Sequence, residues 1–137
     1  MRTSEEIVRA YFDALNQRDY ETASALFADD CEFVSVASGA RFRGTASMLH
    51  GLREFADAFP DWNVEVASVV SSGPYVVTEW KTTGTHEGMF RGESATGIRF
   101  RRDGCSVAEV EGEQIVRYRD YYDRATLFEQ LGLTDVL

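Results

Sequence analysis

The sequence predicts an α+β fold, in which a curved antiparallel sheet forms a cone covered by three N-terminal helices, with a short C-terminal helix. Two observations predict it. Apolar residues recur at helical spacing in three segments within residues 3–59 and again near the end of the chain. Long β-branched and aromatic runs fill the part between residue 59 and that last segment. Two pairs of these runs are separated by tight turns, which makes them antiparallel neighbours. The length fits one domain, so we expect residues 1–137 to form a single unit.

The chain opens with an amphipathic helix followed by a shorter one. Thr3 or Ser4 followed by Glu6 is a typical helix cap, and apolar residues then recur at helical spacing. The polar run 16–19 interrupts this pattern, which resumes over residues 20–27. The two segments predict a helical hairpin.

A short strand and a loop connect this hairpin to the third helix. Residues 31–36 predict the strand, and residues 38–44, which include two glycines, predict the loop. Apolar residues at helical spacing over 48–59 predict the third helix, and Pro60-Asp61 ends it.

Most of the remaining chain predicts strands. The β-branched and aromatic runs are 62–72, 75–86, 98–111 and 114–122. Ser72-Gly73-Pro74 and Glu111-Gly112-Glu113 are the tight turns, and a looser glycine-bearing stretch separates the other pair. A last helix over 124–131 begins after Asp123 as its cap and ends at Gly132.

The composition argues against several classes of partner. The net charge is −9 and the pI is near 4.7, so the chain repels phosphate backbones and anionic membrane surfaces. We therefore expect no nucleic-acid and no membrane partner. Cys31 and Cys105 are isolated, which predicts small core residues, no metal site, no disulfide framework and a cytoplasmic location. The N-terminus has the pattern of a helix start rather than of a signal peptide, and no apolar run reaches membrane-spanning length.

Alternation along the strands predicts which side chains point into the cone, because residues two apart share a face. The predicted inner sets are Val76, Thr78, Trp80, Thr82, Gly84 and His86; Phe100, Arg102, Gly104, Ser106 and Ala108; and Val116, Tyr118, Asp120 and Tyr122. A bulge within Arg101–Gly104 would reverse the middle set. A carboxylate at Asp120, in an apolar aromatic strand, is costly unless it is paired, faces water or takes part in chemistry. The mouth of such a cone is a place for a small ligand.

These segments carry a resemblance to a known family. The order of elements and the segments 11–16, 59–62, 80–88 and 119–123 resemble the SnoaL-like polyketide cyclase family of the nuclear transport factor 2-like superfamily. The most specific parts are Thr83-Gly84-Thr85-His86 and Asp120-Tyr121-Tyr122-Asp123. The resemblance covers nearly the whole chain. It implies a conical barrel with a hydrophobic pocket for an apolar small molecule, a homodimer, and no metal or other cofactor.

The resemblance also implies roles for single residues. In the family's cyclases an aspartate on the final strand is the acid/base of an intramolecular aldol closure, and the matching residue is Asp120. Those cyclases pair it with a histidine on the preceding strand, where this chain has Ser106, and His86 is the candidate that fills the gap. Limonene epoxide hydrolases share the Arg-Asp-aromatic-aromatic-Asp ending but need an Arg-x-Asp on an earlier strand. Trp80-Lys81-Thr82 holds that place here, which disfavours epoxide hydrolysis.

Proton transfer is the chemistry that these residue types support. Removing a proton next to a carbonyl needs a base in an apolar site and a donor for the enolate oxygen. The catalytic candidates are Asp120 and His86, and the substrate-binding candidates are Tyr11, Trp80, Phe100, Arg102, Ser106 and Tyr118. Enolisation, aldol closure and double-bond isomerisation use the same groups, so the sequence does not separate them.

Plainer alternatives stand beside each role. Asp120 could form a structural ion pair with Arg102 or Arg119, and His86 could be a surface or loop-capping residue. The large aromatic residues could be core rather than ligand platform. The whole chain could be a non-catalytic binding protein, or a structural one. In every case Val77, Cys105, Val107 and Tyr121 form an outer sheet face suited to dimerisation.

Overall fold

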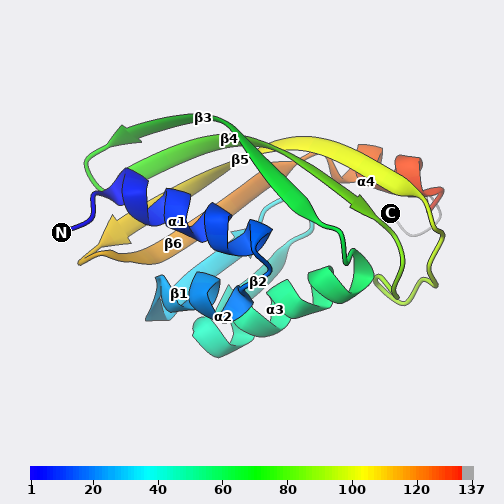
Figure 1. Cartoon of the computed structure of the whole chain (residues 1–137), viewed down its shortest axis with the longest axis horizontal. Coiled ribbons are helices and arrows are strands. Elements are labelled where there is room, and N and C mark those ends of the chain that lie inside the picture. Colours follow the sequence, from blue (N-terminus) through cyan, green and yellow to red (C-terminus); the bar gives the residue numbers. More distant parts are fainter. Residues whose placement is uncertain (134–137) are drawn as a thin grey trace.

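The computed structural model describes residues 1–133 and shows a curved six-stranded sheet with helices packed into its curve (Figure 1). The helices are α1 (Ser4–Asn16), α2 (Tyr20–Ala25), α3 (Thr45–Ala58) and α4 (Arg124–Leu131). The strands are β1 (Phe27–Ser35), β2 (Ala40–Arg43), β3 (Asn63–Ser72), β4 (Tyr75–Thr85), β5 (Arg99–Glu111) and β6 (Gln114–Tyr122). They lie in the order β2-β1-β6-β5-β4-β3. The predicted α+β cone is confirmed.

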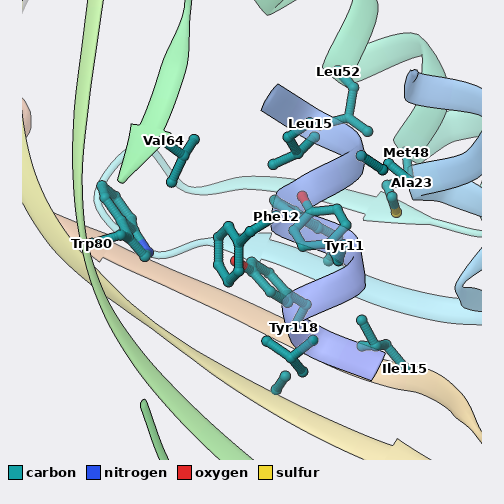
Figure 2. Packing of buried hydrophobic residues seen from close by; sticks show 14 of the residues in the cluster. Tyr11, Phe12, Leu15, Ala23, Met48, Leu52, Val64, Trp80, Ile115 and Tyr118 are labelled. Carbon is teal, nitrogen blue, oxygen red and sulfur yellow. The ribbon is translucent and has the colours of Figure 1, made fainter. Parts of the chain in front are cut away.

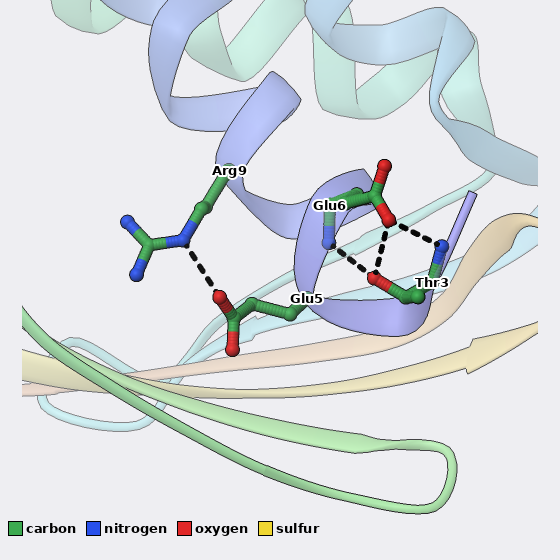
Figure 3. A network of polar contacts seen from close by, with 4 residues as sticks. All are labelled: Thr3, Glu5, Glu6 and Arg9. Atoms are coloured by element: carbon green, nitrogen blue, oxygen red, sulfur yellow. Dashed lines mark hydrogen bonds and ion pairs between the residues drawn. The ribbon is translucent and has the colours of Figure 1, made fainter.

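The helix ends follow the predicted capping chemistry. Thr3 and Glu6 form a reciprocal capping box at the start of α1, and Arg9 pairs with Glu5 one turn further on (Figure 3). Asp123 caps α4, and Gly132 ends it in the left-handed conformation, with φ 72°. These local contacts explain why the bounds of α1 and α4 could be predicted closely.

Two features near the N-terminus differ from the prediction. Helix α2 ends at Ala25, and β1 already begins at Phe27 rather than at residue 31. Residues 40–43, predicted as loop, form β2. At the first place a distant strand satisfies the backbone, because Ile115 N–H donates to the Leu26 carbonyl. At the second, β2 pairs antiparallel with the preceding strand β1 across the short connection 36–39.

One strand pair is parallel within the otherwise antiparallel sheet. β1 runs parallel to β6, with Ser35 in register with Asp120. The other pairs, including the predicted hairpins β3–β4 and β5–β6, are antiparallel. The parallel pair puts the end of β1 beside the part of β6 that carries the acidic residue.

The predicted inner faces are largely correct. The register of β4 with β5 is continuous, so no bulge reverses the face that carries Phe100, Arg102 and Ser106. A bulge between β5 and β6 does shift the start of β6, and Ile115 rather than Val116 is fully buried there. Cys31 is a core residue as predicted, but Cys105 is only partly buried because it points to the outer face.

The core fills the space between α1 and the concave face of the sheet (Figure 2). Tyr11 and Phe12 of α1 lie among side chains of the sheet, and the rings of Tyr11 and Tyr118 meet edge to face with centroids 5.3 Å apart. Met48 and Leu52 extend the core to α3. This packing fixes the side of β4, β5 and β6 on which the candidate residues lie.

Candidate active site

A cavity of about 780 Å³ lies between α3, the end of β1, β2, the segment 88–92 and the β5–β6 hairpin. Most of its lining is apolar or aromatic and includes Phe33, Phe42, Leu52, Phe55 and Trp62. Asp120 and Arg102 are the lining residues from the predicted set. An apolar cavity with few polar groups is typical of a small-molecule site.

Asp120 is held by a hydrogen-bond network centred on Ser106. The two residues are directly opposite each other on β6 and β5, and the Ser106 hydroxyl donates to Asp120 Oδ1 at 2.7 Å. The same hydroxyl accepts from Trp80 Nε1 at 2.6 Å and from the Tyr118 hydroxyl at 2.8 Å. Regular strand pairing places all four side chains on one face.

The network determines how the Asp120 carboxyl is used. A serine hydroxyl has one proton and two acceptor positions, and here all three are engaged. Oδ1 accepts from Ser106, and no hydrogen bond of good geometry reaches Oδ2 from residues 1–133, although the Tyr118 side chain is close enough to lower the pKa of Asp120. Oδ2 is consequently the carboxyl oxygen available to a ligand.

The electrostatics of Asp120 suit proton transfer near neutral pH. Burial raises its pKa from the ordinary 3.8 to about 6, although the Ser106 hydrogen bond and the positive charge of Arg102 act in the opposite direction. Among residues 1–133 it forms no salt bridge, so the structure does not contain the predicted alternative of an ion pair with Arg102 or Arg119. A carboxylate with this pKa is charged at pH 7 and is still basic enough to take a proton.

Removal of this charge should stabilise the fold. Because the folded-state pKa is raised, the folded protein holds the Asp120 proton more tightly than the unfolded chain does, and stability falls as pH rises from about 4 through about 6. At pH 7 the rise of the Asp120 pKa from 3.8 to about 6 corresponds to a cost in folding free energy of up to about 3 kcal/mol. We expect Asp120→Asn to raise the unfolding free energy at pH 7 but not at pH 3.5, as measured by urea denaturation.

The control for this prediction is Asp13→Asn, which removes an exposed carboxylate from α1. It should show no comparable difference between the two pH values. If Asp120→Asn changed stability equally at both, the desolvation of Asp120 would be the wrong explanation.

The other predicted binding residues lie behind Asp120. Trp80, Ser106 and Tyr118 are buried, and their polar atoms serve the network rather than the cavity. Tyr11 packs against Tyr118, and burial, followed by the Asp120 charge, raises the pKa of both tyrosines well above its usual range. Among the residues described, none of these four lines the cavity. They form a layer that positions Asp120.

His86 is placed apart from this network. Its ring is fully buried beside Phe59 and Phe90, and the Thr96 N–H donates to Nδ1 at 3.3 Å, while the Thr96 hydroxyl lies 3.0 Å from the same nitrogen. It is not among the described cavity-lining residues. His86 is therefore not a surface residue, and its ring bonds Thr96 in the connection between β4 and β5. Phe100 packs against Phe59 in the same region.

Arg102 lies among aromatic rings. Its guanidinium carbon is 4.1 Å from the centroid of the Tyr122 ring and between 5.3 and 5.8 Å from those of Phe55, Trp80 and Phe100. Its Nε donates to Thr82 Oγ1 at 3.1 Å. Burial lowers the pKa of Arg102, but a guanidinium stays charged in proteins.

Sequence reasoning missed a pair of serines at the cavity. Ser35 and Ser38 both line it, and their hydroxyl oxygens are 2.9 Å apart. Each hydroxyl has one proton to donate. One of the two protons forms the hydrogen bond between the serines, so the other remains available to donate to a ligand oxygen. Ser35 is beside Asp120 only because β1 pairs with β6, and nothing local in the sequence signals that pairing.

Among residues 1–133 no group of three or more His, Cys, Asp or Glu side chains is placed to hold a metal ion. No helix in that part of the chain is both long and apolar enough to cross a membrane.

Comparison with known proteins supports the same fold over the whole described chain. Residues 5–131 match the family model for SnoaL-like polyketide cyclases. IdmH from Streptomyces antibioticus, a proposed polyketide cyclase, is 25% identical over 96% of this chain and 99% of its own, with a TM-score of 0.82. No curated protein sequence matches the chain.

Two more solved structures mark the range of similar proteins. A proposed SnoaL-like polyketide cyclase from Shewanella putrefaciens has a TM-score of 0.85 at 17% identity, over 97% of this chain and 98% of its own. An LEH-like epoxide hydrolase of M. tuberculosis has a TM-score of 0.76 at 25% identity. The match covers 97% of this chain and 92% of that one. The first likeness shows the fold alone, and the second shows that the architecture also occurs in an enzyme of another class.

Proposed function

The chain belongs to the SnoaL-like polyketide cyclase family, and from this premise we propose that it is a cofactor-independent cyclase or isomerase of an apolar carbonyl compound. Asp120 is the proposed acid/base. The observation that carries the proposal is the free Asp120 Oδ2 in an apolar cavity, on a carboxyl whose pKa is raised to about 6. A mostly apolar cavity of about 780 Å³ supports a polyketide-like or steroid-like ketone as the substrate.

The proposed chemistry begins with proton abstraction. Asp120 Oδ2 takes a proton from the carbon next to the substrate carbonyl, and the electron pair of the broken C–H bond moves onto the carbonyl oxygen as an enolate. In an isomerisation Asp120 returns the proton to another carbon of the conjugated system. In an aldol closure the enolate carbon attacks a second carbonyl of the same molecule, and Asp120 gives the proton to the new alkoxide. Ser35 or Ser38 supplies a hydroxyl donor for a ligand oxygen.

His86 is left out of this scheme. Its contacts are with Thr96 and the aromatic residues beside it, and the described cavity does not include it. We propose that Ser106 instead takes the place beside the acidic residue, as an orienting donor rather than as a second base.

The epoxide hydrolase relative suggests water activation as another reaction for this fold. That mechanism uses an Arg-x-Asp on the strand where this chain has Trp80-Lys81-Thr82. The side chains that bond around Asp120 are a serine, a tryptophan and a tyrosine, without a second carboxylate. This arrangement favours proton transfer at carbon over hydrolysis.

Exchange of a carbon-bound proton tests the proposal directly. With 2-tetralone and a panel of similar apolar ketones in D₂O, we expect the protein to catalyse deuterium incorporation next to the carbonyl, followed by NMR. Because only the ionised Asp120 is a base, the rate should fall about tenfold per pH unit below about 6 and be level above it. Ketones that bind without exchange would instead support the alternative, a non-catalytic small-molecule-binding protein.

We further propose that the protein acts as a cytoplasmic homodimer. Val77 and Tyr121 are 37% and 40% exposed on the outer sheet face, so two large apolar side chains are available there to pack against a second copy. Light scattering coupled to size exclusion tests this, with a monomer as the contrary result.

A further inference from the structure

Arg102 is a half-buried cation without a salt-bridge partner among residues 1–133. Its guanidinium is surrounded by the rings of Phe55, Trp80, Phe100 and Tyr122, and it lines the cavity together with Asp120. Placing a charge among aromatic side chains removes most of its hydration, which cation–π contacts replace only in part. A purely structural arginine in such a place normally has a carboxylate partner.

The described carboxylates near Arg102 do not fill that role. Asp120 is engaged with Ser106 and forms no salt bridge, although its charge acts on Arg102. Asp103 and Asp123 border a shallow cleft that Arg102 also reaches, and neither makes a salt bridge with it. Among residues 1–133, the guanidinium is therefore left with its charge unpaired on the cavity wall.

The hydrogen bonds that remain define what could pair with it. Nε donates to Thr82, and the Tyr122 side chain is close enough to act on the guanidinium. Among residues 1–133 neither Nη group donates a hydrogen bond of good geometry, so these two groups can face a carboxylate-like partner. Two N–H groups side by side match two coplanar oxygens about as far apart as those of a carboxylate. A single neutral carbonyl would use only half of this arrangement.

We propose that Arg102 binds a pair of coplanar oxygens that share a negative charge on an otherwise apolar ligand. Two groups have this chemistry: the carboxylate of an apolar acid, and the enolate of a 1,3-dicarbonyl compound. The proposal rests on the proposed function only in taking this cavity as the ligand site. It narrows the substrate class from apolar ketones to apolar compounds with an anionic oxygen pair.

Calorimetric binding of matched probes tests it. The acid probe is 2-naphthoate, its neutral counterpart is 2-naphthamide, and the dicarbonyl probe is 1-phenyl-1,3-butanedione at pH 9.5, where it is ionised. For the anionic probe that the site accepts, 2-naphthoate or the ionised diketone, we expect Arg102→Met to weaken binding about 10- to 100-fold. The affinity for 2-naphthamide should stay unchanged. Arg102→Lys keeps the charge but not the paired donors, so its affinity for that anionic probe should lie between those of the wild type and Arg102→Met.

The control is Arg101→Met, which removes the neighbouring arginine from the exposed face of β5. It should change the affinity of neither the anionic nor the neutral probe. Asp120→Asn removes a negative charge that acts on Arg102 and should tighten binding of 2-naphthoate at pH 7.5. Thermal melts show whether each variant is folded, and Arg102→Lys carries the test if Arg102→Met is not.

The outcomes separate the two sources of the anion. If only the diketone depends on Arg102, the site takes an enolate, and if 2-naphthoate depends on it, the site takes a carboxylate. The proposal is overturned if wild-type protein binds 2-naphthoate no better than 2-naphthamide and the diketone is insensitive to Arg102→Met. These are binding measurements, so failure of Asp120 as a base would leave them unchanged and would be seen only in the exchange assay.

Discussion

Asp120→Asn is expected to lower the rate of proton exchange on a bound ketone by about 10²- to 10⁴-fold, the usual contribution of a positioned base. Asparagine keeps the shape of the side chain, and its amide oxygen can still accept the Ser106 hydroxyl proton that Asp120 Oδ1 accepts now. It has no basic oxygen at the position of Oδ2. Exchange should therefore be lost while the Kd of the ketone stays within about threefold, because the cavity is unchanged.

The matched control is Asp57→Asn. Asp57 also lines the cavity, but it is an exposed residue of α3. Its exchange rate should equal that of the wild type. Undiminished exchange in Asp120→Asn would exclude Asp120 as the base, and equal losses in both variants would point to a general effect of charge.

Ser106→Ala is expected to have the largest effect on stability. The change removes the acceptor shared by Trp80 Nε1 and the Tyr118 hydroxyl, and it removes the donor to Asp120. Each buried polar group left without a partner costs about 1–3 kcal/mol, so we expect a loss of about 2–5 kcal/mol in urea denaturation. Because the Ser106 hydrogen bond lowers the pKa of Asp120, its loss should also move the exchange profile to higher pH.

Two controls separate these effects. Ser106→Thr keeps the hydroxyl and should retain most of the pH profile. Ser68→Ala removes an exposed serine that donates to Glu79 at 2.7 Å, and it should change stability by less than about 1 kcal/mol. A Ser106→Ala variant as stable as wild type, with an unshifted profile, would mean that the network does not hold Asp120.

Much of the site follows from strand alternation. Trp80, Ser106, Tyr118 and Asp120 were predicted on one face because β4, β5 and the relevant part of β6 pair in regular register. Alternation predicts the face of the sheet on which a side chain lies, but not whether it reaches the cavity or is covered by the core. The sequence therefore could not show that Asp120 lines the cavity while the other three lie behind it. Depth is set by α1, whose Tyr11 packs on Tyr118.

The missed parts depend on contacts between distant segments. Ser35 lies beside Asp120 through the parallel β1–β6 pair, and no local pattern fixes which strands become parallel neighbours. His86 ends in a separate aromatic cluster because Thr96, across a long loop, bonds its ring. Arg102 was predicted either as a binding residue or as an ion-pair partner, and only the packed structure leaves it without a salt bridge among the described residues.

The fully engaged Ser106 hydroxyl has a consequence for the route of the proton. A relay into the protein interior needs a group that can accept a proton on one side and release another on the far side, and Ser106 receives two hydrogen bonds while it gives its own proton to Asp120. With the hydroxyl protons placed this way, no acceptor beyond Ser106 in the described part of the chain is ready to take a proton from it. A proton taken up by Oδ2 then leaves toward the ligand or through the mouth of the cavity. Solvent deuterium therefore reaches the carboxyl through the mouth, so a ketone that fills the mouth should exchange more slowly than one that leaves it open.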